Sequence, residues 1–121
     1  MRLFKVKWFA KFAKRERIQD ASLKEAIARA AQGSVDADLG GHVIKQRVAR
    51  PGQGKSGGYR VIVALRTKER AVFLYGFAKN EKDNIGDDEL RTLKEIAAAW
   101  LEADEKKIRT ALADGLLTEI V

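Results

Sequence analysis

The chain has 121 residues, a formal net charge of +7, one histidine and no cysteine. Without cysteine, neither a disulfide framework nor a thiolate metal site can form, and a single histidine argues against a histidine-based zinc site or a Ser-His-Asp triad. At this length, with 45% hydrophobic residues, we expect one domain over residues 1–121 with a single core, and no metal or cofactor.

The positive charge is concentrated in the middle of the chain. Residues 1–40 carry nine Lys/Arg and five Asp/Glu, residues 41–70 carry eight and one, and residues 71–121 carry seven and eleven. The middle segment alone therefore has a net charge of +7, equal to that of the whole chain. Such a concentrated field attracts a polyanion, either nucleic acid or an acidic protein; the alternative is a solvated surface kept soluble by its charge.

The first third of the chain predicts a strand and two helices. Residues 2–7 alternate basic and apolar side chains, as in a strand with one wet face. From Trp8 the apolar residues follow helical spacing, which predicts a short helix whose aromatic residues are more typical of a core than of a nucleic-acid stacking surface. A second helix, capped by Asp20 or Ser22, ends at Gly33, so the two form a helical hairpin.

The N-terminal residues carry a charge every two or three positions, which argues against a secretory signal. No apolar run approaches the length of a transmembrane helix. We therefore expect a soluble, cytoplasmic protein with no membrane contact.

The basic middle begins with a strand between two expected loops. Residues 34–42 are polar and predict a loop, in which the acidic residues lack the spacing of a calcium site. The strand 43–48 then alternates, with Val43, Lys45 and Arg47 on one face and Ile44, Gln46 and Val48 on the other. Residues 50–58, rich in glycine, predict a loop between two strands. It lacks P-loop spacing and a following helix, so we reject nucleoside-triphosphate binding.

Two strongly apolar segments follow, residues 59–66 and 71–78, separated by a charged turn. They predict a hairpin at the centre of a sheet, buried on both faces. A basic side chain is costly to bury in such a strand, so Arg60 is a candidate functional residue.

The C-terminal third is helical in pattern from Asp87, with acidic residues in the first turn that suit the helix dipole. The helix is expected to break near residues 103–104 and to end at Gly115. The closing residues LLTEIV either pack back on the core or pair as an edge strand.

Three segments carry a resemblance to a known family: Lys45-Gln46-Arg47, Gly58-Tyr59-Arg60-Val61-Ile62, and the stretch from Phe73 to Glu81 that reads FLYGFAKNE. With the expected element order, over about residues 1–95, the chain resembles the RelE/ParE superfamily of toxins from bacterial toxin-antitoxin pairs. The resemblance implies an α+β fold with a small, mostly antiparallel sheet, an N-terminal helical hairpin on one face and a C-terminal helical extension from about residue 87.

The resemblance also implies an activity: metal-independent cleavage of mRNA in the ribosomal A site, which an antitoxin protein inhibits. By position, Arg60, Lys45, Arg47 and Lys79 are the expected catalytic residues. Five further residues are assigned to RNA binding: Arg50, Lys55, Tyr59, Asn80 and His42. Asn80 stands where the family often has an arginine, and no tyrosine follows in residues 79–86; this difference concerns the cleavage rate, and Tyr59 or His42 are the candidates to compensate.

Two other functions remain open at this stage. One keeps the fold and changes the target, as in ParE-like members that inhibit DNA gyrase. The other is a non-catalytic module whose basic stretch only contacts nucleic acid or an acidic protein, since basic residues position phosphate more often than they catalyse.

Overall fold

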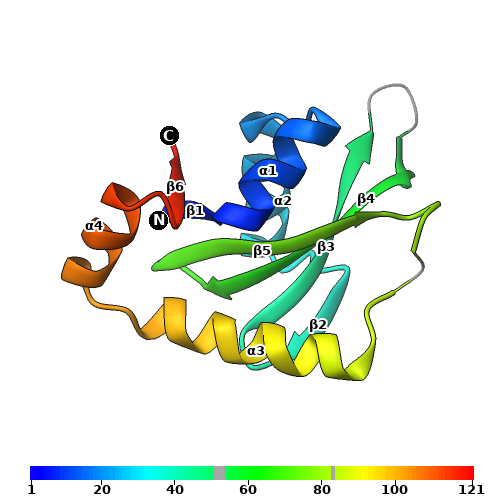
Figure 1. Ribbon diagram of the computed structural model, residues 1–121. Helices are drawn as coiled ribbons and strands as arrows, with labels where there is room; N and C mark the ends of the chain where they lie inside the picture. The colour runs from blue at the N-terminus through cyan, green and yellow to red at the C-terminus, as the bar shows by residue number, and fades with distance from the viewer. Residues whose placement is uncertain (51–53, 83) are drawn as a thin grey trace.

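The computed structural model describes residues 1–50, 54–82 and 84–121, without the side chains of 54–56. Over these residues one six-stranded sheet has the order β2-β3-β4-β5-β1-β6, with β1 and β5 parallel and the other neighbours antiparallel (Figure 1). This confirms the expected α+β class. The elements are β1 (Arg2–Val6), α1 (Lys7–Glu16), α2 (Asp20–Ala31), β2 (Ala37–Gly40), β3 (Val43–Arg50), β4 (Gly54–Arg66), β5 (Arg70–Ala78), α3 (Asp87–Glu102), α4 (Glu105–Ala113) and β6 (Leu117–Ile120).

Helices pack on both faces of the sheet. On one face, α1 and α2 bury side chains such as Phe9 and Leu23 against Val61 and Phe73. On the other, α3 and α4 bury residues such as Leu93, Leu101 and Ile108 against Phe4, Ile62 and Val72. Figure 1 shows the helical hairpin above the sheet and α3 running below it. The central hairpin β4–β5 is buried on both faces, as its continuous apolar sequence predicts.

Three sequence predictions about strands need correction or completion. The expected loop 34–42 contains β2, a short strand paired with β3. The expected loop 50–58 is shorter, because β4 already begins at Gly54 and pairs with Arg50 across a bulge. A Cβ at Gly58 would overlap the carbonyl oxygen of Val48, so this glycine permits close strand approach and does not mark a loop. For the closing segment the sequence allowed either packing on the core or pairing as an edge strand, and the structure shows the edge strand β6 beside β1.

The start of α2 also differs from the expectation. The N-cap is Gln19, and neither Asp20 nor Ser22 caps the helix. The Asp20 carboxylate instead accepts a hydrogen bond from Lys5 Nζ at 3.0 Å, which ties the helix to β1. The break before α4 lies at Ala103 and Asp104, as predicted. No helix in the described part of the chain is long and apolar enough to cross a membrane.

Two arginines of the β4–β5 turn hold the C-terminal end of α3. Arg70 Nη1 donates to the carbonyl oxygens of Trp100 at 2.7 Å and Ala103 at 2.8 Å, and Arg66 Nη1 donates to Leu101 O at 3.3 Å. These carbonyls lie in the last turn, where a helix has no internal donors left and where the dipole favours a cation. The turn of the hairpin therefore fixes where α3 ends.

Replacing Arg70 with methionine keeps much of the stem and removes these hydrogen bonds. We expect unfolding free energy to fall by about 2 kcal/mol, because two carbonyls lose a charged donor. Urea unfolding followed by circular dichroism measures the change. Arg91→Met, at an exposed position on α3, is the matched control. An equal effect of the two substitutions would contradict the prediction.

An ion pair joins β1 and β6, the last two strands at one edge of the sheet. Arg2 donates to both carboxylate oxygens of Glu119 at 2.9 Å, and this contact lowers the pKa of Glu119 below its ordinary value. The folded protein thus keeps the carboxylate charged at a pH where the unfolded chain takes up a proton. The stabilisation is present above the ordinary glutamate pKa and is lost as the pH falls through the lowered one.

Glu119→Gln removes this contribution. We expect the variant to be less stable than the wild type at neutral pH, with a difference that shrinks between about pH 5 and pH 3, because glutamate in the unfolded chain titrates near pH 4.3. Thermal midpoints across this range test the prediction. Glu102→Gln, at an exposed position on α3, is the control, and a difference independent of pH would show that charge is not the cause.

Candidate functional site

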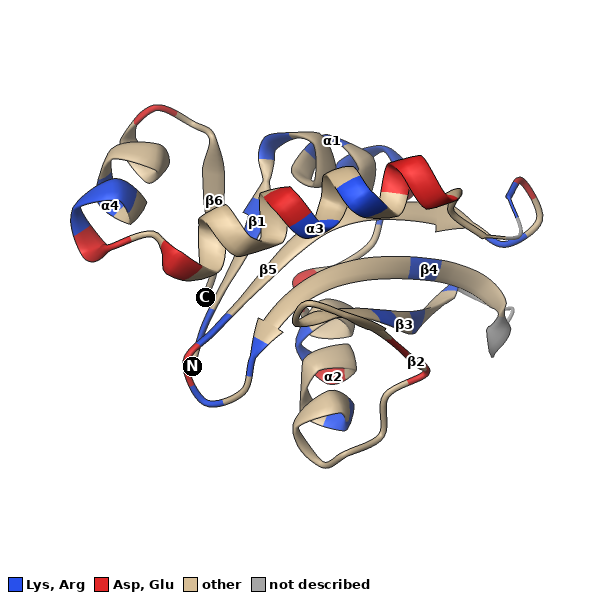
Figure 2. Cartoon of the chain, turned by 90° about the horizontal axis from the view of Figure 1, so that it is seen from below, with Lys and Arg blue, Asp and Glu red and all other residues tan. Residues whose placement is uncertain are grey.

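The pleat of β3 and its register with β4 bring three basic residues to one face of the sheet. Gln46 and Val48 point toward α1 and α2, so Lys45 and Arg47 lie on the opposite face, beside α3. In β4, Arg60 is directly opposite Arg47. We call Lys45, Arg47 and Arg60 the basic face. Figure 2 shows basic bands on β3 and β4 and the acidic first turn of α3.

Arg60 is the buried member of the basic face, with 7% of its surface exposed. Its Nη1 donates to Tyr59 O at 3.4 Å. Burial and, next, the positive charge of Arg47 lower the pKa of Arg60, while Asp36 partly offsets them. An arginine still keeps its charge near neutrality. Two cations facing each other across a strand pair are unfavourable, so the site gains stability when an anion lies between them.

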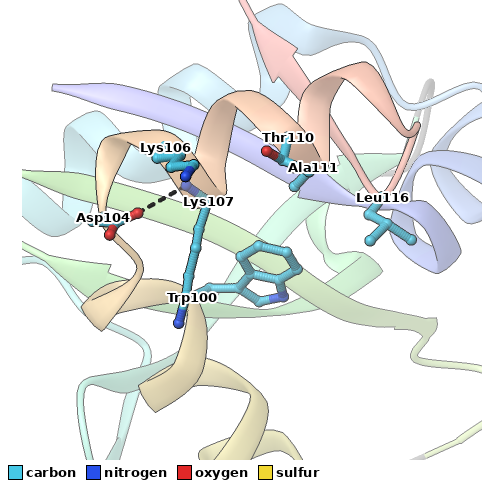
Figure 3. A pocket seen from close by; sticks show the side chains of 7 residues that line it. All are labelled: Trp100, Asp104, Lys106, Lys107, Thr110, Ala111 and Leu116. Atoms are coloured by element: carbon cyan, nitrogen blue, oxygen red, sulfur yellow. Dashed lines mark hydrogen bonds between the residues drawn. The ribbon is translucent and has the colours of Figure 1, made fainter.

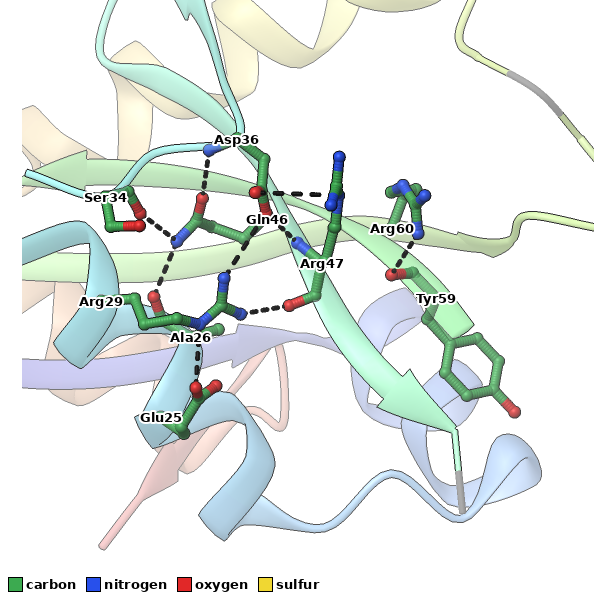
Figure 4. A network of polar contacts seen from close by, with 9 residues as sticks. All are labelled: Glu25, Ala26, Arg29, Ser34, Asp36, Gln46, Arg47, Tyr59 and Arg60. Atoms are coloured by element: carbon green, nitrogen blue, oxygen red, sulfur yellow. Dashed lines mark hydrogen bonds and ion pairs between the residues drawn. The ribbon is translucent and has the colours of Figure 1, made fainter. Parts of the chain in front are cut away.

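A polar network on the other side of β3 supports Arg47. The Asp36 carboxylate accepts from the backbone N–H of Arg47 at 2.6 Å and lies 3.8 Å from its Nε. Arg29 of α2 donates to Arg47 O, and its Nη1 lies 3.6 Å from Asp36. The backbone of Arg47 is thus fixed, whereas its side chain is 49% exposed and, among the described residues, has a long contact with Asp36 (Figure 4).

Gln46 is the buried centre of that network. Its side chain is fully buried; Nε2 donates to Ala26 O at 2.9 Å and to Ser34 O at 3.2 Å, and Oε1 accepts from Asp36 N at 2.8 Å. These bonds join α2, the segment before β2, and β3. The roles of Gln46, Asp36 and Arg29 were not predicted from the sequence, where the signal was an amide on the predicted buried face of the strand.

The third basic residue, Lys45, faces the segment that leads into α3. Its Nζ lies 3.3 Å from Asn84 Oδ1. Lys79 and Asn80 directly follow β5 and are exposed, and the backbone N–H of Lys79 donates to Gly58 O at 3.1 Å. Phe77, two residues before Lys79, is opposite Arg60, so Lys79 lies at the same end of the sheet as the basic face.

The structure does not bring together all the residues predicted for RNA binding. Tyr59 is 2% exposed and points to the helical hairpin, away from Arg60 and Arg47, because neighbouring residues of a strand face opposite sides (Figure 4). Its hydroxyl donates to Glu16 Oε1 at 3.1 Å, and burial first, then this bond, raise its pKa. Tyr59 therefore does not lie on the basic face, and its assignment to RNA binding stays a prediction. Arg50 stacks on the Tyr59 ring at 5.5 Å and is not part of the basic face either.

His42 and Lys55 also lie outside the basic face as described. His42 forms the turn before β3 with φ 64°, and its carbonyl pairs with Leu65 at the other end of the strands. Five residues of strand place it roughly 17 Å from Arg47, so His42 lies apart from the basic face, and its assignment to RNA binding stays a prediction. The side chain of Lys55 is outside the described residues. No cluster of three His, Cys, Asp or Glu that could hold a metal ion occurs in the described part.

In a comparison with protein-family models, residues 1–120 match the RelE toxin of the RelE / RelB toxin-antitoxin system. The chain belongs to the RelE toxin family. A search of curated proteins found no match. The family match extends beyond the resemblance at residues 1–95 and includes α4 and β6. This RelE-family chain is therefore the toxin of a toxin-antitoxin pair, and an antitoxin is its implied partner.

Gln46→Leu tests the support of the basic face. Leucine fills a similar volume but leaves Ala26 O, Ser34 O and Asp36 N without their partner, so we expect a loss of about 2 kcal/mol in unfolding free energy. Urea unfolding measures it, with Gln32→Leu at an exposed position after α2 as control. If Gln46→Leu were as stable as the control, the network would not contribute to the stability of the fold.

Proposed function

We propose that this toxin is a metal-independent endoribonuclease that cleaves mRNA in the ribosomal A site and so inhibits translation. The observation that carries the proposal is the pair Arg47 and Arg60, which lie opposite each other in paired strands with the Arg47 side chain 49% exposed. A phosphate is the anion that satisfies two facing guanidinium groups, because each can bind two of its oxygens. We further propose that residues 1–121 act as one toxin domain in the cytoplasm, with α3 and α4 as its C-terminal extension.

The protein has to perform three tasks in this reaction. The 2′-hydroxyl of the RNA attacks the neighbouring phosphorus, the bond to the 5′-oxygen breaks, and the products carry a 2′,3′-cyclic phosphate and a 5′-hydroxyl. The protein must therefore help remove one proton, stabilise the charge on the phosphorane oxygens and return a proton to the 5′-oxygen.

Arg60 is suited to the second task. It is nearly buried and its backbone lies in the central strand, so its charge is already oriented and little reorganisation is needed when the phosphorane forms. Arg47 complements it: its long contact with Asp36 can be exchanged for a phosphate oxygen, while the Asp36 carboxylate stays bound to the Arg47 backbone. One arginine is thus fixed and the other adjusts to the substrate.

Proton transfer is assigned to lysines. Lys45 lies on the basic face, and Lys79 lies at the same end of the sheet. In this proposal one lysine amine takes the proton of the 2′-hydroxyl and a lysine ammonium returns a proton to the 5′-oxygen. Asn80 remains a proposed RNA contact beside Lys79. With Tyr59 turned into the core, these lysines are the proton-transfer groups that remain from the sequence assignment.

Arg60→Ala tests the proposal. We expect cleavage of mRNA on translating ribosomes to fall at least about 100-fold, the effect of removing one preorganised charge donor. Primer extension on the mRNA measures cleavage, and mass spectrometry of the fragments detects the cyclic phosphate. Arg91→Ala, on the exposed side of α3, is the control, and circular dichroism checks that Arg60→Ala is folded.

The same assay separates the rival functions. Intact mRNA at high concentrations of wild-type toxin would contradict the proposal. Inhibition of DNA supercoiling by gyrase under those conditions would favour a gyrase inhibitor, and salt-sensitive RNA binding without any product would favour a binding module.

A further inference from the structure

An apolar groove lies on a different part of the molecule from the basic face. Two adjoining hollows of about 470 and 460 Å³ share Trp100 and Leu116. Of the five large apolar residues that are exposed in the described chain, three line the groove: Trp8 at 46%, Ile96 at 37% and Leu116 at 49%. We call Trp8, Tyr75, Leu93, Ile96, Trp100 and Leu116 the apolar track.

The apolar track is built from side chains that the fold holds in place. The centroid of the Trp8 ring lies 4.7 Å from that of Tyr75 and 5.4 Å from that of Phe12. These ring contacts hold the tryptophan in place although its outer surface is exposed. The backbone nearby is already paired: Lys7 N–H donates to Leu116 O at 3.1 Å, and β6 occupies the edge of β1. This surface offers a partner side chains and not a strand edge, which suits an amphipathic helix.

The charged residues that line the two hollows are mostly basic. Lys7, Lys106 and Lys107 line the two hollows, are exposed and form no ion pair with the described residues. The acidic residue among them, Asp104, is engaged as the N-cap of α4, where it accepts from the backbone N–H of Lys107 at 2.8 Å (Figure 3). An apolar groove with such a border is complementary to a helix whose apolar stripe is flanked by Asp and Glu.

We propose that the apolar track docks an acidic amphipathic helix of the antitoxin. The helix places apolar anchors over Trp100 and Leu116 and acidic residues against Lys7, Lys106 and Lys107. Anchoring here attaches the antitoxin without use of Arg47 and Arg60. The inference depends on the membership of a toxin-antitoxin pair and does not depend on RNA cleavage.

Ile96→Asp tests the docking surface. The probe is the purified antitoxin encoded by the reading frame adjacent to the toxin gene, and calorimetry measures its affinity for the full-length toxin. We expect at least a 100-fold loss, because a carboxylate would be buried under the helix without a partner. Ala98→Asp introduces the same group at an exposed position of the same helix, outside the apolar track, and is expected to bind normally.

A second pair of variants guards against misfolding. Lys106→Glu and Lys107→Glu change only the border and leave the apolar side chains in place; together they should weaken binding and reduce its dependence on salt. Cleavage of mRNA by Ile96→Asp should match that of the wild type, so a failure of the docking proposal and a failure of the proposed activity are distinguishable.

Two results would overturn the proposal. One is equal antitoxin affinity for Ile96→Asp, the Lys106/Lys107 double variant and Ala98→Asp. The other is a wild-type toxin that dimerises in sedimentation experiments, with Ile96→Asp abolishing the dimer and leaving antitoxin affinity unchanged; the apolar track would then be a contact between copies of this chain.

Discussion

The pairing of β3 with β4 in one register is the constraint on which the site depends. In that register Arg47 faces Arg60, Lys45 faces Ile62, and Gln46 points to the opposite side. A shift by one residue would turn Gln46 toward α3 and move both basic residues of β3 into the apolar layer under α2. Apolar burial on both faces, the close approach at Gly58 and the hydrogen bonds of Gln46 all oppose such a shift.

The cost of this arrangement is electrostatic. A nearly buried arginine beside a second one lowers the stability of the free protein, and Asp36 is one neighbouring group that reduces the repulsion. Contacts on the side of β3 that faces α2 offset this loss of stability. There, Arg29, Asp36 and Gln46 join α2 to β3. The contacts that stabilise β3 thus lie on its buried side, and the side chains of the basic face lie on the other side.

Much of the fold follows from local sequence patterns, because helices and buried strands repeat with fixed periods. The central hairpin, the helical pair and the break before α4 were predictable on that basis. The short strands β2 and β6 were not, since four residues carry little periodicity and their pairing is decided by distant partners. Gly58 misled the loop prediction because glycine serves close strand packing as well as turns.

Some features of the candidate site were likewise predictable from the sequence, and others were not. Strand alternation alone put Lys45 and Arg47 on one face, and applied to β4 it would also have turned Tyr59 away from Arg60. The contributions of Asp36 and Arg29 could not be read from the sequence, because the contacts join α2, the segment before β2, and β3 in three dimensions. The apolar track combines residues from α1, β5 and α3 with Leu116 before β6, and no single stretch of sequence contains its pattern.

The position of β1 has a consequence for how the chain is made. This strand is synthesised before the rest of the sheet, yet its neighbours are β5 and β6, and its Arg2 pairs with Glu119, 117 residues further on. The sheet therefore stays incomplete during most of translation, and its closure requires contacts between distant parts of the chain, which form slowly. While β1 lacks these partners, the layer of core that includes Phe4 stays open, and the nascent toxin is exposed to proteases or to capture by its antitoxin before it is fully folded.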